Sequence, residues 1–181
     1  MTARIAFFRG INVGGRNLLP MRELRALLES VGCSAVKTYI QSGNVVFSHP
    51  DRDDPDLARK FCAAIEAQRH FLPEVILLSA RELQRAISAN PFPGATDDPK
   101  TLHLSFLAST PDKPDLERLE ALKSASEAFH LADRVFYLHA PEGIGRSKLA
   151  QRAERLLGVP ATARNWRTVT RILALAKNQP V

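Results

Sequence analysis

The order of strand-like and helix-like segments constrains the fold of this chain more than any other feature of its sequence. In the first 79 residues, short apolar runs of strand length alternate with longer amphipathic segments of helical period. The strand-like runs are 4–9, two runs within 35–48 on either side of Ser42 and Gly43, and 74–79, and the helix-like segments are 20–31 and one that starts at Asp54. The resulting order is β-α-β-β-α-β, in which a hairpin stands between two helices.

A similar order follows residues 90–99, a stretch with three prolines that predicts a linker. Beyond it, the pattern predicts a strand at 101–108, a helix at 115–124, a strand pair at 127–140 and helices at 148–157 and 166–177. Sheets built mainly from hairpins, with helices between them, are antiparallel or mixed and are covered on one face. We therefore expect an α+β protein with two ferredoxin-like (βαββαβ-type) halves, antiparallel or mixed sheets and an extra C-terminal helix.

This pattern divides the chain into three predicted parts. Residues 1–80 form an N-terminal ferredoxin-like half, residues 81–100 a helix and linker, and residues 101–181 a C-terminal α+β half with basic helices. The last part reads β-α-β-β-α-α, an order that resembles the first half in outline. Ser79 and Glu82 have the spacing of a capping box, which predicts the start of the helix in the middle part.

The composition suits a globular protein that folds without metal ions or disulfides. At 181 residues, the chain can bury about 70% of the surface that its unfolded form exposes. Cys33 and Cys62 belong to no Cys-X-X-Cys motif, so neither a zinc site nor a disulfide framework is expected. The apolar run near the N-terminus is too short for a signal peptide or a membrane helix. We expect a cytoplasmic protein with no cofactor, no metal and no membrane partner.

The positive charge of the chain is concentrated near its C-terminus. The net charge is +6, and residues 143–181 contain eight lysines and arginines against one acid, Glu154. The rest of the sequence is close to neutral. Two interpretations follow: these residues form the solvated faces of amphipathic helices, or they form Arg-rich helices that bind RNA or DNA.

The segment RGINVGGRN, residues 9–17, places three glycines between the first strand and the first helix. Backbone N–H groups in such a loop can converge on an anion. The glycine spacing matches a P-loop, but Arg16 and Asn17 stand where a P-loop has the Lys and Ser/Thr that hold phosphate and Mg²⁺. The segment therefore predicts a glycine turn, which is either purely structural or presents Arg9, Asn12 and Arg16 to a ligand.

Two further stretches combine positive charge with a helix start. Ser147 has the position of an N-cap before the helix at 148–157, and Lys148 adds positive charge beside it. Asn165 has the same position before the last helix, where Arg164 and Arg167 can hold a phosphate or carboxylate bidentately. Each stretch can equally be the start of an ordinary capped helix.

The predicted hairpin carries polar residues that suggest a different kind of site. Strand alternation places Tyr39 and Gln41 on one face, close to Asn44 in sequence. A metal-free enzyme site near Gln41 and Asn44 is therefore one alternative, although no reaction can be named for it. The five histidines have no metal-ligand spacing, and the sequence contains no recognisable catalytic constellation. Whether the protein is an enzyme stays open.

Several motifs, taken together, resemble a known family. They are RGINVGG (9–15), YIQSGNVVF (39–47), NPF (90–92), the SKL stretch (147–149) and TARNW (162–166). Their combination, from about residue 5 to residue 173, is similar to the bacterial family catalogued as domain of unknown function 1697. The resemblance implies an α+β protein with two related halves, and it brings no established activity or cofactor.

The polar residues of these motifs lead to one main functional hypothesis. We expect the loops to converge on a shared anion site, so that the protein binds a phosphate-bearing small molecule or nucleotide at a basic, glycine-loop surface. The candidate ligand-binding residues are Arg9, Asn12, Gly14, Gly15, Arg16, Gln41, Asn44, Ser147, Lys148, Arg164, Asn165 and Arg167. The alternatives are an RNA- or DNA-binding module that uses the C-terminal Arg-rich helices, and the metal-free enzyme.

Overall fold

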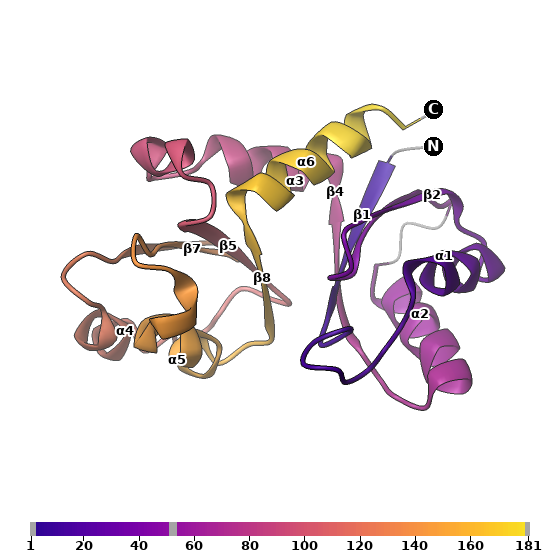
Figure 1. Ribbon diagram of the computed structural model, residues 1–181, viewed down its shortest axis with the longest axis horizontal. Helices are drawn as coiled ribbons and strands as arrows, with labels where there is room; N and C mark the ends of the chain where they lie inside the picture. The colour runs from indigo at the N-terminus through magenta and orange to yellow at the C-terminus, as the bar shows by residue number, and fades with distance from the viewer. Residues whose placement is uncertain (1–2, 51–53, 180–181) are drawn as a thin grey trace. The chain divides into compact units, whose positions relative to one another are not determined.

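The computed structural model describes residues 3–50 and 54–179, and Figure 1 shows the helices and strands. The N-terminal half contains β1 (Ala3–Arg9), α1 (Met21–Ser30), β2 (Ser34–Tyr39), β3 (Asn44–Ser48), α2 (Asp54–Arg69) and β4 (Glu74–Ser79). Its four strands form an antiparallel sheet in the order β2-β3-β1-β4. This βαββαβ order is the ferredoxin-like pattern that the sequence predicted.

The core of the N-terminal half lies between its sheet and helices α1 and α2. Ala6 and Phe8, two residues apart in β1, belong to this core, because alternate residues of a strand point to the same face. Leu24 and Leu28, one turn apart in α1, join them with Phe61 of α2. Figure 1 shows both helices on the same side of the strands. The apolar residues that recur with strand or helix period in the sequence therefore lie on the faces of these elements that pack in the core.

The remainder of the chain repeats this architecture. It contains α3 (Ala80–Ser88), the short 3-10 helix η1 (Pro93–Asp97), β5 (Leu102–Leu107), α4 (Leu116–Leu122), β6 (Ala128–Ala132), β7 (Val135–His139), the 3-10 turn η2 (Ile144–Arg146), α5 (Lys148–Leu157), β8 (Ala161–Asn165) and α6 (Trp166–Lys177). The second antiparallel sheet has the order β6-β7-β5-β8. Leu119 of α4 and Leu149 of α5 pack with Phe136 of β7 in its core. Both α4 and α5 therefore cover this sheet.

Strand β8 is the main departure from the sequence prediction, which had a loop and a helix cap between α5 and α6. It pairs with β5, with Thr162 opposite Phe106 and Ala163 opposite Ser105. Because Thr162 is the single buried residue of β8, the segment has no alternation of apolar side chains that could indicate a strand. With β8 in place, the second half has the complete βαββαβ order, followed by α6.

Side-chain caps set the starts of several helices. The backbone N–H of Ser79 donates to Oε2 of Glu82 at 2.7 Å, and the N–H of Glu82 donates to Oγ of Ser79 at 3.1 Å. This reciprocal pair confirms the capping box that the sequence predicted at the start of α3. Asp115 caps α4 in a similar way, because its Oδ1 accepts from the backbone N–H of Arg118 at 3.0 Å.

The chain forms two compact units. One comprises Met1–Arg85 with Arg171–Val181, and the other comprises Ala86–Thr170. The divisions fall within helices α3 and α6, and each unit contains one of the two sheets. None of the helices in the described part of the chain is long and apolar enough to cross a membrane.

Candidate anion-binding site

The glycine loop after β1 folds into a small hairpin of its own. Val13 and Arg16 form an antiparallel bridge, and the N–H of Arg16 donates to the carbonyl oxygen of Val13 at 3.0 Å. Between them, Gly14 and Gly15 have φ angles of 58° and 73°. Two successive residues with positive φ are typical of a tight hairpin turn, and glycine adopts this conformation without strain. These two glycines therefore have a structural reason to be glycine.

Asn12 holds this loop to its surroundings. Its side-chain Nδ2 donates to the carbonyl oxygens of Leu19 and Gln41, both at 2.9 Å, and its Oδ1 accepts from the N–H of Leu19 at 2.8 Å. In the same loop, Nδ2 of Asn17 donates to the carbonyl oxygen of Gly10 at 2.9 Å. The amide of Asn12 is thus occupied by backbone groups, which ties the glycine loop to the β2–β3 turn.

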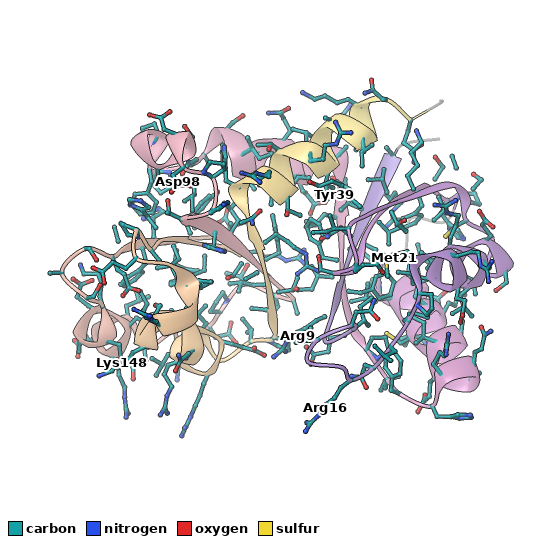
Figure 2. All side chains as sticks on the ribbon, viewed as in Figure 1. Arg9, Arg16, Met21, Tyr39, Asp98 and Lys148 are labelled. Atoms are coloured by element: carbon teal, nitrogen blue, oxygen red, sulfur yellow. The ribbon has the colours of Figure 1, made fainter. Side chains whose placement is uncertain are left out.

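The two arginines of the glycine loop differ in their surroundings. Arg9 is half-buried and forms an ion pair with Glu74 of β4, with 2.5 Å between Nη1 and Oε2. Arg16 is exposed and forms no ion pair with any side chain that the structure describes. Figure 2 shows its side chain extending away from the loop. Of the two, Arg16 has the guanidinium that is open to a ligand.

The hairpin residues have mainly local roles. Asn44 is fully buried, and its Nδ2 donates to the carbonyl oxygen of Tyr39 at 3.1 Å and to Oγ of Ser42 at 2.9 Å. The predicted stripe of Tyr39 and Gln41 is wrong, because β2 ends at Tyr39 and Ile40 has a φ of 49°, which breaks the strand alternation. Gln41 lies exposed in the turn between the strands.

The caps predicted near the C-terminus are present in the unit Ala86–Thr170. Oγ of Ser147 accepts from the N–H of Ala150 at 2.9 Å at the start of α5. Oδ1 of Asn165 accepts from the N–H of Thr168 at 2.9 Å at the start of α6. Both side chains therefore stabilise helix starts, as the sequence predicted.

The arginines beside the second cap lie in different environments. Nη1 of Arg164 donates to Oγ1 of Thr162 at 2.7 Å and to the carbonyl oxygen of Ala163 at 2.8 Å. Burial lowers the pKa of Arg164 to about 10, because desolvation disfavours the charged form. Its guanidinium is still protonated at neutral pH. Arg167, in the first turn of α6, is exposed.

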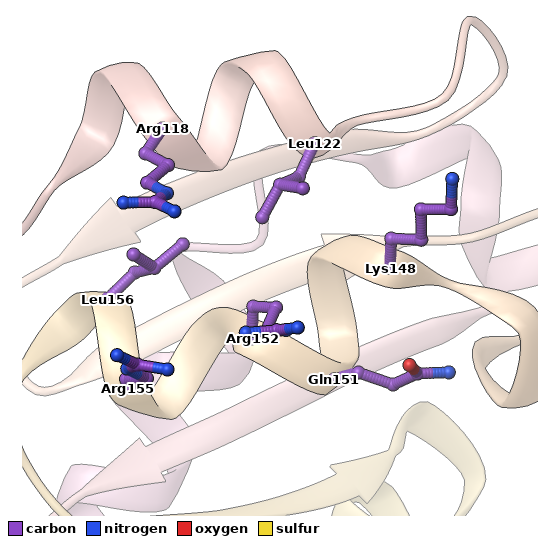
Figure 3. Close-up of a pocket in the computed structure, with 7 residues that line it drawn as sticks. All are labelled: Arg118, Leu122, Lys148, Gln151, Arg152, Arg155 and Leu156. Atoms are coloured by element: carbon purple, nitrogen blue, oxygen red, sulfur yellow. The ribbon is translucent and has the colours of Figure 1, made fainter.

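Four cations line a hollow of about 380 Å³ between α4 and α5, termed the cationic hollow below. Its lining residues are Arg118 and Leu122 of α4 and Lys148, Gln151, Arg152, Arg155 and Leu156 of α5. Figure 3 shows Arg118 extending from α4 toward α5, with Leu122 and Leu156 between the two helices. The hollow therefore has an apolar base and a rim of positive charge.

The charged residues that line the cationic hollow are all positive. Its lining contains no carboxylate, and none of its four cations forms an ion pair with another residue of the described chain. The cations of α5 lie four and three residues apart, which puts Lys148, Arg152 and Arg155 on one face of the helix. Several like charges around a concave surface raise the local positive potential and attract anions.

The cationic hollow overlaps the residues selected from the sequence only at Lys148. Arg152 and Arg155 belong to the basic region at residues 143–181. Their helical spacing with Lys148 is a sequence signal for one cationic face that contains all three residues. Arg118 could not be found this way, because it lies in another helix, 30 residues before Lys148. The convergence of the glycine loop with the SKL and TARNW stretches stays a prediction.

The thiols of this chain are poor nucleophiles. Burial is the main reason that the pKa of Cys33 rises to about 12, and it also raises the pKa of Cys62. Among the side chains that the structure describes, no three His, Cys, Asp or Glu are grouped closely enough to hold a metal ion.

The comparison with known proteins agrees with the resemblance seen in the sequence. Residues 1–137 match the family model described as "Protein of unknown function (DUF1697)". The chain belongs to this family. The matched DUF1697 residues include the glycine loop and the β2–β3 hairpin, whereas the SKL and TARNW stretches lie beyond them.

A solved structure that matches nearly the whole of this chain supports the fold. It is that of the "conserved bacterial protein SP0830 from Streptococcus pneumoniae", which is 25% identical to this DUF1697 chain, with a TM-score of 0.73. The similarity covers 97% of this chain and 98% of that chain. Among curated proteins, none matches the chain.

Proposed function

We propose that the protein binds a phosphate-bearing small molecule or nucleotide in the cationic hollow. The observation that supports the proposal is the set of four cations, contributed by two helices, with no acid in the lining. Arginine favours phosphate because its planar guanidinium can donate two parallel hydrogen bonds to phosphate oxygens. The apolar side chains at the base can contact the uncharged part of the ligand.

The ligand class can be found by thermal shift. The screen includes inorganic phosphate, sulfate, phosphate monoesters, nucleotides and a short single-stranded RNA. A ligand present at 100 times its Kd stabilises the fold by about 2.7 kcal/mol, which raises Tm by several degrees for a chain of this size. If no phosphate compound raises Tm, the proposal is wrong.

The double substitution Arg152→Gln with Arg155→Gln is expected to weaken phosphate binding about 10- to 100-fold, because it removes two charged donors from the hollow. Isothermal titration calorimetry measures the affinity of each variant for the compound that gives the largest shift in Tm. The matched control is Arg22→Gln with Arg25→Gln in α1, where two exposed arginines have the same three-residue spacing. Equal affinity losses in both double variants would show a general charge effect and would contradict a site between α4 and α5.

A nucleic-acid strand is the second candidate ligand. The regular spacing of the cations along one face of α5 favours it, because such a row can follow successive phosphates. The salt dependence of affinity separates the two candidates. A strand that contacts all four cations should lose affinity with a log-log slope near −3, from about −0.7 per phosphate contact on single strands. A small phosphate ligand should give a shallower slope.

A further inference from the structure

The cationic hollow adjoins a second hollow of different chemistry, termed the mixed hollow below. It has a volume of about 430 Å³ and lies where the end of α4, the segment before β6 and the segment before α5 meet. Its charged lining residues are Lys123, Glu127, Glu142, Arg146 and Lys148. Leu122 and Lys148 line both hollows. A ligand held by its phosphate in the cationic hollow can therefore extend past Lys148 into the mixed hollow.

Glu127 is largely buried but not fully satisfied. Its relative exposure is 9%, and its Oε2 accepts from the N–H of Ser124 at 2.9 Å. Its Oε1 accepts no hydrogen bond from the described residues. This oxygen is not sealed from solvent. Because this oxygen reaches solvent, a ligand hydroxyl can donate to it in place of water. The open oxygen of Glu127 therefore suits a ligand that donates a hydrogen bond.

Glu142 offers a second acceptor at the same hollow. Its Oε1 accepts from the hydroxyl of Ser126 at 2.8 Å, which leaves its Oε2 without a donor in the described chain. An ammonium group in the mixed hollow would be repelled by the lysines and arginine of the lining. A second phosphate would be repelled by the two carboxylates. Hydroxyl groups fit both kinds of neighbour, because each can donate to a carboxylate and accept from a cation. Carboxylates are used in this way to bind ribose hydroxyls in nucleotide sites.

We propose that the ligand of this protein is a phosphorylated sugar, free or as part of a nucleotide. Its phosphate lies in the cationic hollow, and its neighbouring hydroxyls donate to Glu127 and Glu142 in the mixed hollow. This inference rests on the proposed function, since the phosphate anchors the sugar. It adds the chemical class of the group to which the phosphate is attached.

The test compares ribose 5-phosphate with methyl phosphate, a monoester without a sugar, by titration calorimetry on the full chain. Wild-type protein is expected to bind ribose 5-phosphate at least about tenfold more tightly, because one hydrogen bond to a charged group already contributes about that factor. Glu142→Gln and Glu127→Gln should each reduce this preference toward one. Neither substitution should weaken binding of methyl phosphate, because both remove negative charge near the phosphate. Two variants are used because Glu127 also supports the backbone at Ser124.

The outcomes distinguish the two proposals. If both compounds bind wild-type protein equally, the sugar inference is overturned while phosphate binding stands. If ribose 5-phosphate is preferred and both variants keep that preference in full, the assignment to Glu127 and Glu142 is overturned. If neither compound binds, the proposed function fails and the sugar inference fails with it. A preference that either folded variant loses supports the inference.

Discussion

Phe61→Ala is expected to lower the free energy of unfolding by about 3–5 kcal/mol, the range for removing a fully buried aromatic side chain. Phe61 of α2 has no exposed surface. Its ring lies 5.4 Å from that of Phe47, at an interplanar angle of 75°, and 6.3 Å from that of Phe8, measured between centroids. These contacts join α2 to β3 and β1, so the substitution leaves a cavity where helix and sheet meet.

Urea denaturation, followed by circular dichroism, measures the effect of Phe61→Ala. The control is Leu72→Ala, at a side chain that is 64% exposed, which should change stability by less than about 0.5 kcal/mol. A loss below about 1 kcal/mol for Phe61→Ala would mean that the core of the N-terminal half is packed differently.

Gly43→Ala should destabilise the protein by about 2–5 kcal/mol, from left-handed backbone strain and overpacking together. Gly43 has a φ of 70°, and an added Cβ would lie 2.7 Å from Cβ of Phe8 and 2.8 Å from Cδ1 of Ile11. Both neighbours are buried, so neither has free space to move into. The carbonyl oxygen of Gly43 also accepts from the N–H of Phe8 at 2.8 Å, which holds the turn against β1.

Gly10→Ala separates the two causes, because Gly10 has a similar φ of 74° but an added Cβ would have no neighbouring atom within 4 Å. It should therefore show the backbone strain alone, about 1–2 kcal/mol. Chemical denaturation of both variants gives the comparison. If Gly43→Ala lowers the free energy of unfolding no more than Gly10→Ala does, Phe8 and Ile11 do not approach the turn as closely as the structure places them.

The element order was predictable because it depends on local patterns. Hydrophobic periodicity and caps such as Ser79 with Glu82 act over a few residues, and they identified the helices and most strands. Strand β8 was missed because its pairing with β5, about 50 to 60 residues away, decides its conformation rather than any apolar alternation. A backbone hydrogen-bond partner at that distance leaves no trace in the local pattern.

The candidate site was less predictable for the same reason. The sequence predicts an anion site at the glycine loop, and that prediction stands untested beside the structural roles of Gly14 and Gly15 in the turn and of Asn12 in holding it. Asparagine and glycine tolerate positive φ, so their abundance in RGINVGGRN is also a signal for a tight turn. The cationic hollow depends on how α4 packs against α5, which brings Arg118 beside the cations of α5. That packing cannot be derived from spacing along one helix.

Amide NMR on isotopically labelled full-length protein, titrated with methyl phosphate, tests the central claim most directly. Phosphate binding in the cationic hollow predicts saturable shifts that are largest for the backbone amides around Arg118 and from Lys148 to Leu156. The amides of α1, including Arg22 and Arg25, should not shift. Saturable shifts confined to residues outside α4 and α5, or no saturable shifts at all, would contradict the claim that the hollow between these helices binds phosphate.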